Sequence, residues 1–153
     1  MSVVKIKYFG ESSALYGKRG ACPATGQACG LDLRACFAED TVCIEPGDRY
    51  PVPTGIAIEI CEKNIAAFLY SRSGWGAKKG LTIAQGVGVI DPDFRGEIIA
   101  YMLNTSNEAV TVERGDRIAQ LVFHPYVPVS TEESAELTAT ERGIGGYGHT
   151  GNN

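Results

Sequence analysis

The segment GVGVIDPDFRGEIIAYMLN, residues 86–104, combines an aspartate turn with apolar runs on both sides. Alternating hydrophobic residues around Asp91-Pro92-Asp93 predict a β-hairpin. The open end of a hairpin presents backbone N–H and C=O groups that can hydrogen-bond a flat base, with Asp91 holding a water molecule beside it. Phe94 would add an aromatic wall. The alternative is plain turn chemistry, in which Pro92 fixes φ and the aspartates bond nearby N–H groups.

A second candidate is the run LYSRSGWG, residues 69–76, in which Arg72, Ser73 and Gly74 precede a predicted short helix. A guanidinium, a hydroxyl and unpaired amide groups at a helix start together suit phosphate oxygens. We predict a short helix near SGWGAKK, with Ser73 as its N-cap. Trp75 would anchor the core, with contact to a partner as the alternative. A capped helix start with a surface arginine is the alternative.

Two polar residues interrupt apolar strands. Asp32 lies between leucines in QACGLDLRA, residues 27–35, and Gln120 interrupts ERGDRIAQLVF, residues 113–123. A buried carboxylate must be satisfied by backbone groups or by an arginine, so a purely structural role is open for Asp32. An inward-facing amide also needs partners, and Gln120 is therefore either a structural hydrogen-bond hub or a residue that positions water.

The chain closes on RGIGGYGHTG, residues 142–151, in which five glycines leave little that can pack in a core. No lysine follows these glycines, so the P-loop pattern is absent. Arg142 and Tyr147 are unusual choices for a segment that binds nothing, and glycine lets a chain close over a ligand. A disordered terminus is the alternative.

The elements that must position these residues are short strands. Hydrophobic residues alternate with a period of two in GIAIEI, GVGVI and AVTVERGDRIAQLVF, and turn clusters such as EPGDRYP and NTSNE separate the runs. Many short strands at this spacing are typical of an all-β sandwich or barrel. We predict one all-β domain over residues 1–128 with one short helix. A polar connector and a flexible, glycine-rich C-terminal arm follow over residues 129–153.

Composition limits the classes of function. The 153 residues are 44% hydrophobic and 21% charged, which is ordinary for one globular domain. A net charge of −4 argues against general nucleic-acid binding, and no apolar run is long enough for a membrane span. Because no signal-peptide pattern is visible, we expect a cytoplasmic protein. The five cysteines include no CxxC pair, and we expect them to be reduced and mostly buried.

Taken in order, five segments resemble the five motifs of the all-β dUTP pyrophosphatase (dUTPase) family. They are ACGLDLRA, RSG, GVGVIDPDFRGEI, RGDRIAQLVF and RGIGGYGHTG, and the resemblance covers roughly residues 22–151. It implies a distorted jelly-roll-like barrel that forms a homotrimer, with active sites shared between subunits and each arm closing over another subunit's site. It also implies hydrolysis of dUTP to dUMP and pyrophosphate, with Mg2+ bound to the triphosphate.

The resemblance implies a role for each matching residue. Asp91 would deprotonate the water that attacks the α-phosphorus, Gln120 would help to hold that water, and Asp32 would support Mg2+ through its water ligands. The residues expected to bind the phosphates, sugar and base are Arg72, Ser73, Gly74, Gln85, Gly88, Val89, Ile90, Phe94, Arg142, Tyr147 and Gly148.

Within that implied site, Arg72 and Ser73 would bind the phosphate chain and Arg142 the terminal phosphate. Phe94 would stack under the deoxyribose and Tyr147 would cap the uracil. Phe94 stands where the family usually has tyrosine, and Tyr147 stands where it usually has phenylalanine. Each departure exchanges one aromatic ring for another.

Two other functions compete with this interpretation. The dCTP deaminase family shares the fold and a similar turn, but it carries a catalytic glutamate in a pattern like G-x-x-x-L-E. Counting from Gly96 puts Tyr101 at the glutamate position, which disfavours deamination. The second alternative is a dUTPase-derived regulatory protein that binds a partner and uses nucleotide as a switch. The presence of both Asp91 and Gln120 favours turnover.

Overall fold

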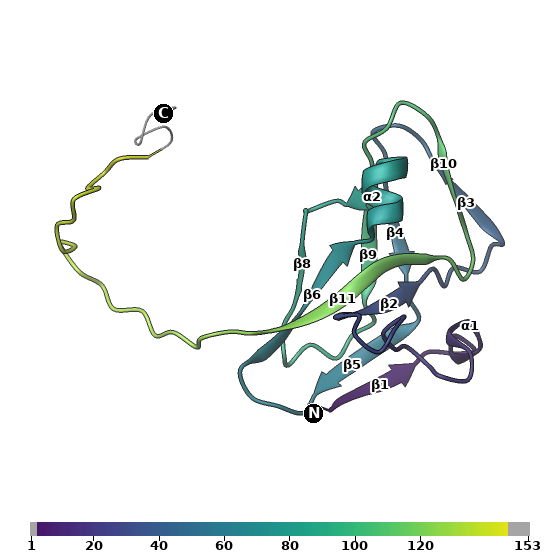
Figure 1. The fold of residues 1–153 in the computed structure, drawn as a ribbon, viewed down its shortest axis with the longest axis horizontal. Coiled ribbons are helices and arrows are strands. Elements are labelled where there is room, and N and C mark those ends of the chain that lie inside the picture. The colour runs from purple at the N-terminus through teal and green to yellow at the C-terminus, as the bar shows by residue number, and fades with distance from the viewer. Residues whose placement is uncertain (1–2, 147–153) are drawn as a thin grey trace.

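The computed structural model describes residues 3–146, and short β-strands make up most of its regular structure (Figure 1). In chain order the elements are β1 (Val4–Tyr8), α1 (Ser13–Tyr16), β2 (Gly30–Arg34), β3 (Thr41–Ile44), β4 (Arg49–Pro53), β5 (Ile56–Ile60), β6 (Ile65–Ser71), α2 (Ser73–Lys79), β7 (Leu81–Ile83), β8 (Gly88–Ile90), β9 (Ile99–Asn104), β10 (Val110–Glu113) and β11 (Arg117–Pro125). The predicted all-β fold is confirmed.

The core is aliphatic and draws on nearly every strand. Leu33, Val52, Ile56, Met102 and Leu121 are fully buried, and they come from five different strands. The alternation that predicts strands is visible in β10, where Val110 and Val112 are buried and their neighbours are exposed. Burial of these side chains is the main force that holds the short strands in place.

The candidate site residues depend mainly on the four-stranded sheet, whose order is β2-β11-β6-β8. All its pairings are antiparallel, and Gln120 in β11 lies opposite both Asp32 in β2 and Tyr70 in β6. A register shift between Arg117 and Ala119 marks a β-bulge at the start of β11. Such a bulge breaks the simple in–out alternation of side chains.

The predicted hairpin around Asp91 is wrong in its pairing. Strand β8 pairs with β6, whereas β9 pairs with β4 and β7. Residues 84–98 therefore form a long connection from β7 to β9, and its short strand β8 pairs in the four-stranded sheet with β6. Alternating hydrophobicity identifies strands but carries no information about which strands pair, and this is why the prediction failed.

Three further details differ from prediction. One additional helix, α1, is a single turn, which is too short to show helical periodicity. Ser73 is the first residue of α2 and not its N-cap: Arg72 takes the extended cap conformation, and no side chain bonds the cap. The five cysteines are unpaired as expected, but the expectation of burial is wrong for the exposed Cys29, Cys43 and Cys61.

After β11 the chain continues as an arm that leaves the strands and runs away from them (Figure 1). No helix or strand forms between residues 126 and 146, so the segment TEESAELTATE is a connector, as expected. Within the described part of the chain, no helix is long and apolar enough to cross a membrane.

Candidate functional site

The expected phosphate-binding residues lie together at one end of β6. Strand β2 supplies Asp32, β11 supplies Gln120, and the junction between β6 and α2 supplies Arg72 and Ser73. They surround a hollow of about 450 Å3, which we call the phosphate pocket. Its lining consists of Ala24, Ala28, Cys29, Gly30, Asp32, Arg72, Ser73, Gly74 and Gln120. Residues from three of the five sequence motifs therefore converge here.

A carboxylate between two arginines orients the pocket. The Oδ1 atom of Asp32 forms an ion pair with Arg72 Nε at 2.8 Å, and its Oδ2 accepts a hydrogen bond from Arg117 Nη1 at 3.0 Å. Arg72 Nη1 also donates to the carbonyl oxygen of Arg117 at 2.9 Å. Charge-assisted bonds of this kind are short and directional. The Asp32 side chain is only 14% exposed, and of the two expected kinds of partner, backbone groups or an arginine, the structure shows arginines.

Gln120 is held at the pocket wall by the neighbouring strand. Its Nε2 donates to the carbonyl oxygen of Ser71 at 3.1 Å, and no donor among residues 3–146 bonds its side-chain oxygen. Gly30 lies directly beside it: a Cβ at that position would be 3.2 Å from Gln120 Oε1. The first residue of β2 is therefore glycine where the amide needs room.

The start of α2 closes the pocket on another side. Trp75 is 7% exposed, which confirms its expected place in the core. Its indole Nε1 donates to the Arg117 carbonyl oxygen at 2.8 Å, the same atom that Arg72 contacts. Because the first amide groups of a helix lack intrahelical acceptors, Ser73 and Gly74 present free N–H groups near the arginine.

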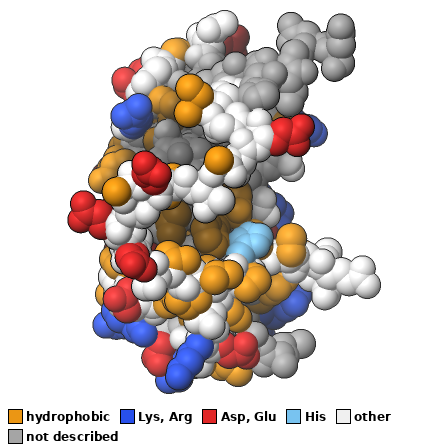
Figure 2. Space-filling view, turned by 90° about the vertical axis from the view of Figure 1, so that its left-hand side faces the viewer, with side chains coloured by type: hydrophobic (Ala, Val, Ile, Leu, Met, Phe, Trp, Pro, Cys, Tyr) orange, Lys and Arg blue, Asp and Glu red, His pale blue; other side chains and the backbone are white. Residues whose placement is uncertain are grey.

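A second hollow, of about 700 Å3, lies beside the 84–98 loop at the other end of β6. We call it the loop pocket, and it is lined by Ala66, Phe68, Val89, Asp91, Pro92, Asp93 and Tyr126. Asp91 opens a turn in which its carbonyl oxygen accepts from the Phe94 N–H at 3.1 Å. Figure 2 looks onto this side of the molecule and shows hydrophobic side chains gathered around a hollow.

Glycines shape the 84–98 loop at two points. A Cβ on Gly96 would lie 2.6 Å from Phe94 Cζ, so the aromatic ring rests on the bare glycine backbone. A Cβ on Gly88 would lie 3.3 Å from Gln85 Nε2, which locates Gln85 next to β8. Phe94 is 44% exposed and Val89 is 60% exposed, so both are free to contact a bound molecule.

The structure does not bring the two pockets together within one chain. Ile90, just before Asp91, lies opposite Ala67 in β6, and Arg72 follows Ala67 by five residues, directly after the end of β6. At about 3.3 Å per residue, that spacing separates the two ends by roughly 16 Å. Asp91 is therefore remote from Arg72, Ser73 and Gln120 of its own chain.

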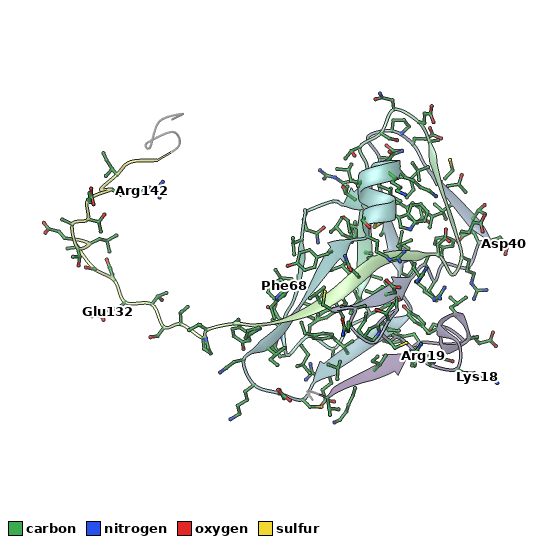
Figure 3. The ribbon with its side chains drawn as sticks, in the orientation of Figure 1. Lys18, Arg19, Asp40, Phe68, Glu132 and Arg142 are labelled. Carbon is green, nitrogen blue, oxygen red and sulfur yellow. The ribbon has the colours of Figure 1, made fainter. Side chains whose placement is uncertain are left out.

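The arm residues are also apart from both pockets. Arg142 lies on the exposed arm, well away from the strands (Figure 3), and its Nε donates to the Gly145 carbonyl oxygen of the same segment. Tyr147 and Gly148 lie outside the described residues, as does His149.

Arg117 does not line the phosphate pocket but bonds Asp32, which does, and sequence reasoning missed it. The β-bulge after it leaves Ile118 and Ala119 both buried, so simple alternation does not predict which way Arg117 faces. The available signal was the acidic residue in β2, for which an arginine was one of the two expected kinds of partner.

Metal ligation has little direct support from the side chains. Among residues 3–146, no group of three or more His, Cys, Asp or Glu side chains is arranged to hold a metal ion. Within the described part of the chain, Asp32 is the only carboxylate that lines the phosphate pocket; its Oδ1 is paired with Arg72 and its Oδ2 accepts from Arg117. A cation here would have to be held mainly by a bound ligand and by water.

Comparisons with known proteins agree on one family. A family model described as dUTPase matches residues 19–151. The deoxyuridine 5'-triphosphate nucleotidohydrolase of Desulfitobacterium hafniense (strain DSM 10664 / DCB-2) is 43% identical over 148 residues, covering 97% of this chain and 95% of the relative. The protein of the same name from Escherichia coli O9:H4 (strain HS) is 42% identical over 128 residues, or 84% of each chain.

Solved structures share the fold. A mutant dUTPase of Staphylococcus bacteriophage 80alpha, determined with dUpNHpp, superposes with a TM-score of 0.80 over 97% of this chain and 98% of that one. Its sequence identity is 23%, so this likeness concerns the fold alone.

Proposed function

The chain belongs to the dUTPase family, and on that premise we propose that it hydrolyses dUTP to dUMP and pyrophosphate. This activity limits the incorporation of uracil into DNA and supplies dUMP for thymidylate synthesis. The observation that carries the proposal is the phosphate pocket, where Asp32 fixes Arg72 beside Ser73 and Gln120. A pre-oriented guanidinium next to a hydroxyl and free amide groups suits a chain of phosphates.

In the proposed reaction, Asp91 accepts a proton from a water molecule as the water oxygen attacks the α-phosphorus. The bond between the α-phosphorus and the oxygen that bridges to the β-phosphorus breaks, and pyrophosphate leaves with that electron pair. Gln120 holds the attacking water through its free side-chain oxygen. Arg72 and Ser73 donate to the phosphate oxygens on which negative charge develops.

Base and sugar recognition is assigned to the 84–98 loop and the arm. Main-chain groups of Gly88, Val89 and Ile90 bond the uracil, with Gln85 beside them, and Phe94 stacks under the deoxyribose. Tyr147 and Gly148 close over the base, while Arg142 binds the terminal phosphate. The exposure of Phe94 and Val89 supports this assignment, since both side chains are available for contact.

We assign Mg2+ as the cofactor, bound mainly by the triphosphate. Asp32 would support the ion only through its water ligands, because its Oδ1 is already paired with Arg72 and its Oδ2 accepts from Arg117. When bound, the ion neutralises phosphate charge, and Mg2+ commonly keeps several waters in such sites.

The proposed active form is a cytoplasmic homotrimer in which neighbouring chains share each site. The separation of roughly 16 Å between the two pockets of one chain supports this arrangement, because one bound nucleotide must touch Asp91 and Arg72 together. One chain would supply the phosphate pocket, a second the 84–98 loop, and the arm would come from another subunit.

The test is the release of pyrophosphate from dUTP, dCTP, dTTP and UTP, each with and without Mg2+. We expect rapid release from dUTP with Mg2+ and little from the other three nucleotides. Release of ammonia from dCTP would favour a deaminase and contradict the proposal. Tyr101 makes that outcome unexpected, since its phenol stands where the deaminase needs a carboxylate.

A further inference from the structure

The connector, residues 131–141, holds the entire net charge of the protein. It contains Glu132, Glu133, Glu136 and Glu141 and no lysine or arginine. The chain has 18 acidic and 14 basic residues, so without these four glutamates the acidic and basic residues balance at 14 each. Repulsion between like charges keeps such a segment extended, and its carboxylates can bind a positively charged surface.

The connector has no partner on its own strand domain. All its residues are exposed, and within the described chain no hydrogen bond joins residues 127–146 to the strands. The last such bond to the body runs from the Tyr126 N–H to the Asn64 carbonyl oxygen. The acidic side chains are therefore available to another surface.

A lysine-bearing hollow of about 630 Å3 lies at the end of α2. We call it the lysine hollow. It is lined by Lys78, Lys79, Gly80, Ser106, Asn107, Glu108, Ala109, Val110 and Thr111. Lys79 Nζ lies 4.0 Å from the centre of the Trp75 ring. Among residues 3–146 neither Lys78 nor Lys79 forms an ion pair. A second hollow with basic residues lies on β1 and β5, but its Lys5 already pairs with Glu59.

The lysine hollow lies close enough to the phosphate pocket for one arm to reach both. Lys78 and Lys79 follow Ser73 by five and six residues in α2, which is about 8 to 9 Å along a helix. An extended chain spans about 3.3 Å per residue, so Glu141 and Glu136 lie within about 20 Å of Arg142. An arm that carries Arg142 to the phosphate pocket can therefore bring these glutamates over α2.

We propose that the acidic connector of one copy of this chain docks on the lysine hollow of another copy when its arm closes over the phosphate pocket. This inference rests on the proposed function for the closed position of Arg142. Lys78 and Lys79 bind the connector carboxylates, and the polar side chains of Ser106 and Asn107 border the contact. The docking surface is thus distinct from the residues that touch the nucleotide.

The direct test is carbodiimide cross-linking, which joins a carboxylate to a nearby amine. Oligomers assembled from unlabelled and 15N-labelled chains are treated with the reagent in the presence of Mg2+ and dUpNHpp, then analysed by mass spectrometry. We expect mixed-isotope cross-links from Glu136 or Glu141 to Lys78 or Lys79. Cross-links of the connector only to other lysines, or only within one chain, would overturn the proposal.

Charge reversal supplies a functional readout. The Lys78→Glu/Lys79→Glu variant should raise KM for dUTP roughly three- to tenfold at low salt, with kcat less affected, because exposed ion pairs are modest and screened. Reversal of all four connector glutamates to lysine should raise KM similarly, and combining both sets should restore it. Lys18→Glu/Arg19→Glu is the matched control, since both side chains are exposed beside α1, far from the arm (Figure 3).

The two proposals fail separately. If the unmodified protein releases no pyrophosphate from dUTP, the proposed function fails, and the cross-linking experiment still decides whether the connector docks. If the protein hydrolyses dUTP but the Lys78/Lys79 reversal behaves like the Lys18/Arg19 control, the docking proposal alone fails.

Discussion

At the residue scale, Asp32 explains how a surface pocket acquires a fixed arginine. A lone surface ion pair contributes little because two long side chains must be ordered in water. Here the carboxylate is mostly buried and bonds two guanidinium groups, while the Arg117 carbonyl oxygen holds Arg72 from a second direction. Arg72 would therefore need little further ordering to bind the proposed phosphate chain, which is the advantage of a pre-organised site.

Asp91→Asn tests the proposed base. The amide keeps the size and turn geometry of the carboxylate but cannot accept the proton, so we expect kcat for dUTP to fall at least about 100-fold. Binding of dUpNHpp, measured by calorimetry, should change little. Pyrophosphate release at a rate near that of the unmodified protein would remove Asp91 from this role.

Tyr16→Phe tests a pH dependence of stability. Burial raises the pKa of Tyr16 to about 12, although the Arg34 N–H that bonds its oxygen acts in the opposite direction. Between pH 10 and 12 the phenol of Tyr16 ionises in the unfolded chain but not in the native protein. The contribution of Tyr16 to the free energy of unfolding, which is fully present below pH 10, is therefore lost as pH rises. The expected loss is about 1.4 kcal/mol per pH unit.

The measurement is urea unfolding from pH 8 to 12 for the unmodified protein and the variant. Near neutral pH, Tyr16→Phe should lower the free energy of unfolding by about 1 to 2 kcal/mol, because the Arg34 N–H and the Thr54 carbonyl oxygen lose their partner. The difference should shrink above pH 10. Tyr101→Phe, which removes an exposed hydroxyl, is the control, and parallel curves for the unmodified protein and Tyr16→Phe would contradict the argument.

At the scale of elements, the 84–98 loop is held at both ends and in the middle. The β7–β9 pairing closes its base, and β8 is fixed against β6. A loop anchored at three points can present backbone groups in a fixed pattern without a rigid hairpin. Its tip remains free to carry Asp91 and Phe94 into contact with a neighbouring chain.

Gly96→Ala tests the packing of that tip. The new methyl group would lie 2.6 Å from Phe94 Cζ, so the exposed ring must move while the fold remains intact. We expect KM for dUTP to rise about tenfold and discrimination against UTP to weaken. The free energy of unfolding should change by less than about 0.5 kcal/mol. Steady-state kinetics with both nucleotides provide the measurement.

Gly26→Ala is the matched control, because no atom lies within 4 Å of the added methyl group. Its kinetics should equal those of the unmodified protein. Unchanged discrimination in Gly96→Ala would mean that the Phe94 ring does not touch the sugar.

Several elements were predictable because local pattern determines them. Strands β5, β10 and β11 follow from β-branched alternation, and the need of Asp32 for a hydrogen-bonding or charged partner follows from the cost of burying a charge. Other features depend on long-range contacts that no local pattern encodes. They include the pairing of β8 with β6, the orientation of Arg117 after a bulge, and the cap conformation of Arg72.

At the scale of the whole molecule, the distance between the phosphate pocket and the loop pocket has a direct consequence for activity. If each site takes its pocket and its loop from different chains, two inactive variants can repair each other in mixed trimers. We therefore predict complementation between Asp91→Asn, which damages the loop half, and Arg72→Ala, which damages the pocket half. Each variant alone should be nearly inactive.

In a one-to-one mixture refolded together, a site is intact when its pocket comes from an Asp91→Asn chain and its loop from an Arg72→Ala chain. Random assembly makes this combination in roughly a quarter of sites, so about 25% of the activity of the unmodified protein should return. Asp91→Asn mixed with Phe94→Ala is the control, because both changes damage the loop half and no intact site can form. If the first mixture stays as inactive as its parents while mixed trimers are detected by mass, each site lies within one chain, and the roughly 16 Å gap must instead be closed by movement of the loop.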